Sequence, residues 1–217
     1  MNDARADVWR IGVRQTLAGP NRGLAESRRD GAKITFSQDS IATGGRQDMT
    51  FDGVGHATVR LISGVGYLQA DEAGLMGFFG VSQSDAARLG DKWISVRPGQ
   101  KIGSTTYAQL TDGITLSPIA SELAITGPYT AVADATVAGQ RTFRVQGHVP
   151  ASQKDPGTAR ETLNVTASAP LRPVQLTLSG DPGNTDQITF GNWGEKLSIP
   201  VPPNAQPANS LGTPSLT

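Results

Sequence analysis

The sequence predicts a mainly β (α+β) fold, in which an antiparallel sheet of about ten or eleven strands carries a few short helices. From Ala32 onward, apolar and polar residues alternate with the two-residue period of β-strands. Short turns such as Gly44-Gly45 and Ser63-Gly64 separate the strands, and loops of this length cannot carry a parallel crossover. The strands must hide their apolar faces either in a two-sheet sandwich or in one sheet curled around the helices.

The first third of the chain predicts one helix followed by four strands. Residues 4–17 place Val8, Trp9 and Ile11 among arginines, which predicts an amphipathic helix that ends before Pro20. Residues 22–31 are interpreted as a second helical turn or a loop. The alternating pattern then predicts strands at 32–38, 46–53, 56–63 and 65–70.

The middle of the chain has helix signals. Asp71 and Glu72 open a short predicted helix over 72–79, and Ser82 is a candidate N-cap for a second helix. A strand is predicted at 92–96. Two more helices are predicted at 104–112 and 115–125, the latter with Ile119 and Leu123 on one apolar stripe.

The last third predicts strands again, at 129–137, 140–149, 160–168, 172–180, 186–192 and 196–201. No linker-like break separates the two sets of strands. The chain is therefore expected to form a single domain over 32–203, with an N-terminal helix and connector at 1–31. Residues 204–217 are rich in Pro, Asn and Ser, which predicts a disordered tail.

Composition argues against several classes of function. Nineteen basic and nineteen acidic residues give zero net charge, which provides no electrostatic footprint for a nucleic acid. The chain has no cysteine and two isolated histidines, His56 and His148, so we expect no metal site and no cofactor. No nucleophile has an evident base, which favours a protein that is not an enzyme. No stretch approaches the roughly 18 apolar residues of a spanning helix.

Four segments together resemble actinobacterial envelope lipoproteins of the LppX/LprG type, which have the fold of the LolA/LolB lipoprotein carriers. They are VRLISGVGYLQADEAGL (59–75), LGDKWISVRPGQ (89–100), RETLNVTASAPLRPVQLTLSG (160–180) and ITFGNWGEKLSIPVPPNA (188–205). The resemblance spans roughly 32–205. It implies a half-barrel, a curled sheet over helices that enclose a hydrophobic cavity for acyl chains. Trp93 and Trp193 are assigned to packing of the sheet against the helices.

The resemblance also implies a function and a location. We expect non-enzymatic binding and transport of a lipid or acylated glycolipid in the cell envelope, at the outer face of the cytoplasmic membrane or in a periplasm-like space. Family members begin with a signal peptide and a lipid-modified cysteine, and this chain has neither, so a membrane anchor would lie outside it. Two alternatives stay open: an envelope sensor or regulator with the same fold and a protein partner, or a β-sandwich adhesion or structural module with a filled core.

The candidate lipid-binding residues are the apolar residues expected on the concave face of the sheet and on its helices. They are Phe36, Phe51, Leu61, Tyr67, Leu75, Met76, Phe78, Phe79, Val81, Ile119, Leu123, Leu163, Val165 and Leu176. Five of them form the apolar stretch LMGFFGV at 75–81. This stretch is interpreted either as a buried helix that caps the sheet or as a mobile lid over a ligand, because its glycines weaken a helix.

Overall fold

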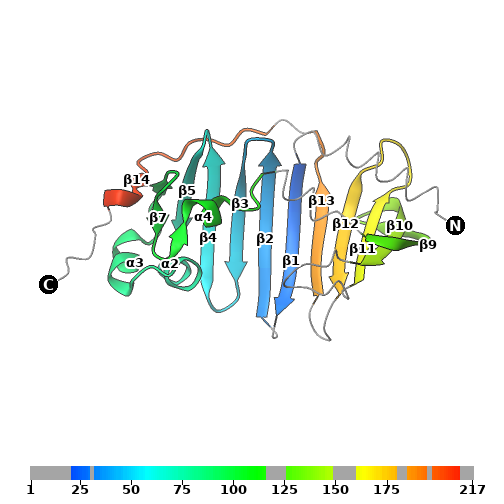
Figure 1. Cartoon of the computed structure of the whole chain (residues 1–217), viewed down its shortest axis with the longest axis horizontal. Helices are drawn as coiled ribbons and strands as arrows, with labels where there is room; N and C mark the ends of the chain where they lie inside the picture. The colour runs from blue at the N-terminus through cyan, green and yellow to red at the C-terminus, as the bar shows by residue number, and fades with distance from the viewer. Residues whose placement is uncertain are drawn as a thin grey trace.

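The computed structural model describes residues 21–29, 32–115, 126–148, 160–179, 185–194 and 197–210. The described strands form one twelve-stranded sheet, in the order β14-β6-β5-β4-β3-β2-β1-β13-β12-β11-β10-β9, and a small hairpin of β7 and β8. Figure 1 shows the long sheet as an open, curled layer with its edges at β14 and β9. One curled sheet confirms the predicted mainly β fold and excludes the two-sheet sandwich for this part of the chain.

The sheet consists of two antiparallel meanders. The first contains β1 (Asn21–Arg29), β2 (Ala32–Ile41), β3 (Gly44–Phe51), β4 (Gly55–Ile62), β5 (Val65–Ala70) and β6 (Ile94–Val96). The second contains β9 (Thr126–Val137), β10 (Gln140–His148), β11 (Arg160–Thr166), β12 (Pro173–Ser179) and β13 (Thr185–Gly191). They join where β1 pairs with β13 along seven residue pairs, from Arg22–Gly191 to Arg28–Thr185.

The N-terminal end of the sheet differs from the sequence prediction. Residues 22–31 were expected to form a helical turn or a loop, but Asn21–Arg29 is strand β1 in the interior of the sheet. The expectation of a helical turn or a loop is therefore wrong for 21–29. The predicted helix at 4–17 lies outside the described residues.

The C-terminal end also differs. No strand forms over the described residues 197–201, although 196–201 was expected to be one. Instead β14 (Gln206–Pro207) pairs in parallel with β6, and a 3₁₀ turn, η1 (Ala208–Ser210), follows. These residues belong to the segment that was expected to be disordered. The sheet thus extends beyond both ends of the expected 32–203 unit, and the division of the chain into domains stays a prediction.

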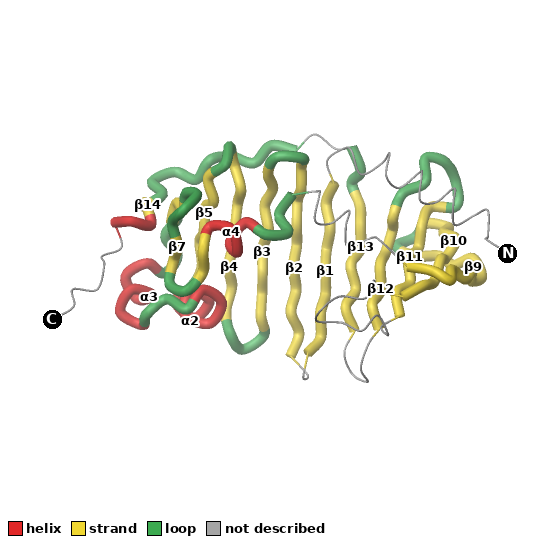
Figure 2. Tube along the Cα trace, viewed as in Figure 1, coloured by secondary structure: helices red, strands yellow, loops and turns green. Residues whose placement is uncertain are grey.

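Three short helices lie together at the β4–β6 end of the sheet (Figures 1 and 2). They are α2 (Glu72–Phe79), α3 (Gln83–Leu89) and α4 (Tyr107–Thr111), with the hairpin of β7 (Lys101–Ile102) and β8 (Thr105–Thr106) between the last two. Helix α2 matches the predicted range, and Ser82 caps α3 as predicted. The predicted helix at 115–125 lies almost wholly outside the described residues. No described helix has the length and apolar character that spanning a bilayer requires.

Helix α2 is fastened to strand β4 through Asp71. The carboxylate of Asp71 accepts one hydrogen bond from the backbone N–H of Gly74 at 2.6 Å and another from the backbone N–H of His56 at 3.0 Å. It therefore caps the helix and joins its first turn to the sheet. Gly74 is needed for this approach, because a Cβ atom there would lie 2.5 Å from the carbonyl oxygen of His56.

The face of the sheet that points away from the helices holds the C-terminal segment. The guanidinium of Arg60 lies 4.5 Å from the ring centre of Trp93 and donates a hydrogen bond to the carbonyl of Pro200 at 2.9 Å. Burial, and then the nearby Arg46 cation, lower the pKa of Arg60, while Asp48 opposes the shift. Arg60 thus holds residues 197–205 on the path to β14, where the backbone N–H of Gln206 donates to the carbonyl of Trp93.

Proline in place of Ala25 should unfold the sheet at its junction. Ala25 pairs with Phe36 on one side and with Ile188 on the other, and proline in an interior strand removes a ladder hydrogen bond. We expect the free energy of unfolding to fall by roughly 3 kcal/mol or more, measured by urea denaturation. The control is Ala42→Pro, in the exposed two-residue turn between β2 and β3, where proline is tolerated. Equal stability of the two variants would contradict the paired position of β1.

Alanine in place of Gly74 should destabilise the protein although alanine favours helices. Its Cβ would meet the backbone of His56, which cannot move without shifting β4, so we expect a loss of about 1–3 kcal/mol. Gly77→Ala is the matched control, because the nearest atom there is a side-chain methyl of Val54, which can rotate. Thermal unfolding of both variants measures the difference. A Gly74→Ala variant as stable as the wild type would contradict the close docking of α2.

Candidate functional site

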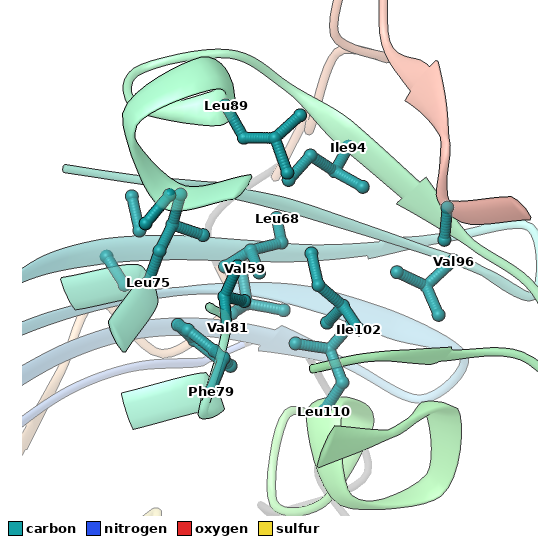
Figure 3. Packing of buried hydrophobic residues seen from close by; sticks show 14 of the residues in the cluster. Val59, Leu68, Leu75, Phe79, Val81, Leu89, Ile94, Val96, Ile102 and Leu110 are labelled. Carbon is teal, nitrogen blue, oxygen red and sulfur yellow. The ribbon is translucent and has the colours of Figure 1, made fainter. Parts of the chain in front are cut away.

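The apolar stretch LMGFFGV divides into buried and exposed residues. Leu75, Phe79 and Val81 are 0%, 5% and 7% exposed. They pack in a cluster with residues of β4, β5 and β6, where Figure 3 shows them against Val59 and Leu68. Phe78 packs on this cluster and is half-buried, whereas Met76 is 38% exposed. The packing favours the interpretation of Leu75, Phe79 and Val81 as core.

The end of this stretch is also held in place. The backbone N–H groups of Gly80 and Val81 donate to the carbonyls of Met76 and Leu75, and Gly80 adopts the left-handed conformation that such a helix end requires. The carbonyl of Phe79 accepts a further hydrogen bond from the backbone N–H of Ser104 at 2.9 Å. Both ends of α2 are therefore fixed to neighbouring elements, which argues against α2 as a freely moving lid.

A second apolar cluster lies at the other end of the sheet. Leu163, Val165 and Leu176 are fully buried there, with Phe190 6% exposed beside them. The ring of Phe190 stacks on that of Trp193, with the centres 6.1 Å apart and the planes 26° from parallel. Half-buried side chains complete the cluster; they are Phe143, Leu171, Leu178 and Ile188.

A row of apolar residues connects the two clusters across ten strands. Residues directly opposite one another in neighbouring strands share a face of a sheet. Followed from β5 to β9, the paired residues are Ala70, Ala57, Met49, Phe36, Ala25, Ile188, Leu176, Leu163, Val145 and Ala131. Nine strand spacings of about 4.8 Å give this row a length of roughly 40 Å. Hereafter it is called the apolar row.

The apolar row has a defined middle and polar neighbours. Met49 and Ile188, which flank the middle strands β2 and β1, are half-buried, whereas the outer residues Ala57 and Leu176 are 0% exposed. Gln38 and Gln47 interrupt the next row on one side. On the other side Ser27, Asp186 and the buried Glu161 interrupt a row that also contains Ile34 and Leu178. Of these three rows across the face, only the apolar row has an apolar residue on every strand.

The chain after α4 lies beside the middle of the row. The hydroxyl of Ser40 donates to the carbonyl of Ile114 at 2.8 Å, and the side-chain amide of Gln38 donates to the carbonyl of Gly113 at 2.6 Å. Gly45 lies against Ile114 as well. These contacts hold residues 113–114 over β2 and β3 on the face that carries the row. The segment therefore borders the row on the side of Gln38 and Gln47.

A cleft of about 410 Å³ opens at the ends of β10 to β13. The corner between β11 and β12 forms one wall, and the end of β13 with Trp193 forms the other. Its lining residues are Gln140, Thr166, Ser168, Ala169, Pro170, Arg172, Phe190, Gly191, Asn192 and Trp193. Phe190 and Trp193 belong both to this cleft and to the second apolar cluster, so the cleft adjoins the apolar row.

The structure does not bring all of the predicted site residues together. Leu61 joins the first cluster, Leu163, Val165 and Leu176 form the second, and the register sets Phe36 between them. Tyr67 pairs with Arg60, on the face opposite Val59 and Leu68, so it does not lie on the expected concave face. Phe36 pairs with Met49 and Phe51 with Gly55, but the side chains of both, like Ile119 and Leu123, lie outside the described part of the structure.

Sequence reasoning missed the cleft altogether. Arg172 was not singled out, and Trp193 was assigned to packing alone. Two segments of the sequence, 166–172 and 190–193, combine polar and aromatic or proline residues of the kind that line a cleft. Their proximity could not be predicted, because it depends on the pairing of β12 with β13.

Comparison with known proteins identifies the fold. No protein-family model matches the chain, and no curated protein sequence matches it. The crystal structure of LprF from Mycobacterium bovis is similar with a TM-score of 0.58 and 16% identity, covering 90% of this chain and 95% of that one. The crystal structure of the lipoprotein LppX from Mycobacterium tuberculosis is similar with a TM-score of 0.57 and 14% identity, covering 91% and 100%.

These likenesses extend over nearly the whole length of each chain. The resemblance that the four sequence segments indicated is thereby confirmed for the fold. The chain has the curled-sheet fold of the mycobacterial lipoproteins LprF and LppX.

Proposed function

We propose that this protein binds the acyl chains of a lipid along the apolar row and carries the lipid within the cell envelope, without catalysing a reaction. The observation that carries this proposal is the unbroken apolar register across ten strands, which joins two buried clusters, whereas polar residues interrupt the rows on either side of it. A long, narrow apolar line suits a long, narrow apolar ligand.

Burial of an acyl chain along the row would supply the driving force for such binding. Each methylene group removed from water contributes about 0.8 kcal/mol. The middle of the row, from Met49 on β3 to Ile188 on β13, spans three strand spacings, or about 14 Å. Ten methylene groups buried there would contribute roughly 8 kcal/mol, from which the cost of association must be subtracted.

The likeness in fold supports the location and the ligand class of this proposal. LppX is a lipoprotein, and it shares the curled sheet with this chain. We therefore place the protein in the envelope, next to a membrane surface from which lipid is taken and to which it is delivered. Within the row, Met49 fits this role because a thioether side chain adapts to ligands of irregular shape.

Substitution of Ile188 by Asn should reduce lipid binding. The polar amide would interrupt the middle of the apolar row, and we expect the affinity for a radiolabelled fatty acid to fall by about tenfold, the equivalent of 1–2 lost methylene contacts. Delipidated protein is titrated with the fatty acid, and native mass spectrometry counts the bound acyl species. Met49→Gln, on the other side of the middle, should have the same effect in a different strand.

Thr189→Asn is the matched control, since residue 189 neighbours Ile188 on the same strand but lies on the opposite face. It should leave both affinity and unfolding temperature near those of the wild type. Purified protein that contains no acyl species, and that takes up none after delipidation, would refute the proposed function. If Ile188→Asn and Met49→Gln lower stability but leave lipid affinity unchanged, the row is core rather than binding surface.

A further inference from the structure

The cleft beside Trp193 contains a cation, and no described residue supplies a counter-charge to it. Arg172 is the charged side chain among the described residues that line it. The Nε atom of Arg172 is buried, and within the described structure it has no hydrogen-bond partner. None of the ion pairs formed by described residues involves this guanidinium. Burial has removed the hydration of this Nε without supplying a partner in its place, which is unfavourable for a charged group.

The backbone holds Arg172 in this position. Its N–H donates to the hydroxyl oxygen of Thr166 at 2.9 Å, and its carbonyl accepts from the N–H of Thr166 at 2.9 Å. The indole N–H of Trp193 donates to the carbonyl of Pro173 at 3.1 Å, one residue after Arg172. The corner between β11 and β12 and the end of β13 are thus joined on both sides of the cleft. The site is organised before any ligand enters.

The cleft also lies next to the apolar row, at strand β13. Phe190 follows Ile188 by two residues on β13, a step of about 7 Å on the same face of the strand. Its ring stacks on Trp193, which lines the cleft with Arg172. An amphiphile whose chain lies on the row at Ile188 can therefore place its polar end at Arg172, with the Phe190–Trp193 pair beside the junction.

From these observations we propose that the cleft binds the anionic head group of the lipid, a phosphate or a carboxylate, through the guanidinium of Arg172. This inference rests on the proposed binding of acyl chains along the row and specifies the lipid class. Guanidinium presents its N–H donors in a planar fork that matches the oxygens of phosphate and carboxylate. The side-chain amides of Gln140 and Asn192 and the hydroxyl of Ser168 line the same cleft and suit the uncharged polar part of a head group.

Calorimetric titration with chain-matched amphiphiles tests the proposal. The probes are a lysophosphatidic acid, a monoacylglycerol with the same acyl chain, and glycerol 3-phosphate, which has no chain. The wild type should bind the lysophosphatidic acid at least about tenfold more tightly than the monoacylglycerol, as a charge-assisted hydrogen bond implies. Arg172→Gln should abolish this preference and leave monoacylglycerol affinity within about twofold. Arg172→Lys, which keeps the charge and loses the fork, should retain part of the preference.

Arg97→Gln is the charge-matched control, because Arg97 is exposed beyond β6 at the other end of the sheet. It should preserve the preference for the phosphate. Equal affinity of the wild type for the two amphiphiles would overturn the head-group site while leaving acyl binding intact, and this measurement needs no variant to fold. A preference that survives in Arg172→Gln would also overturn it. Arg172-dependent binding of glycerol 3-phosphate without binding of either amphiphile would refute both the lipid source and the proposed function.

Discussion

The pairing of β1 with β13 is the constraint on which the rest of the structure depends. Without it the molecule would consist of two separate meanders, each with an apolar patch at its own end. The ladder from Arg22–Gly191 to Arg28–Thr185 fixes one meander against the other in a single register. Because a slip of one residue would turn every side chain of a strand to the opposite face, this register is also what aligns Ala25 with Ile188 and makes the apolar row continuous.

The closest packing of the molecule is concentrated at the two ends of the sheet. At the β4–β6 end, α2 to α4 bury Leu68, Leu75 and Ile94 completely, and Asp71 fastens the first helix to β4. At the β10–β13 end, a smaller cluster borders a polar cleft. The half-buried Met49 packs against the first cluster and the half-buried Ile188 against the second, each at the side that faces the middle strands. The packing of the two ends therefore reaches the margins of the middle strands, where Met49 and Ile188 remain partly exposed.

Local sequence pattern predicted those elements whose stability is local. VGYLQA alternates, is bounded by turns, and is strand β5 over the predicted range; helix α2 has its cap in Asp71 and its stop in Gly80. Strand β1 was missed because NRGLAESRR is mostly polar and owes its conformation to partners far away in the sequence. Phe36, Leu163 and Leu176 of the apolar row were among the predicted site residues, but their alignment in one row and the cleft of Arg172 were missed for the same reason, since each is assembled by register between strands. The tail was misjudged because β14 is held by a parallel pairing with β6, of which composition gives no sign.

The position of β1 in the sheet also determines when its two edges can be paired during synthesis. One edge of β1 pairs at once with β2, but the other edge has no partner until β13, the last of the long strands, leaves the ribosome. For most of translation this edge is an unpaired strand, the kind of surface that invites pairing with other chains. Contacts of such large sequence separation also slow folding. A nascent chain of this fold therefore depends on shielding of β1, and truncation anywhere before Thr185 leaves that edge permanently open.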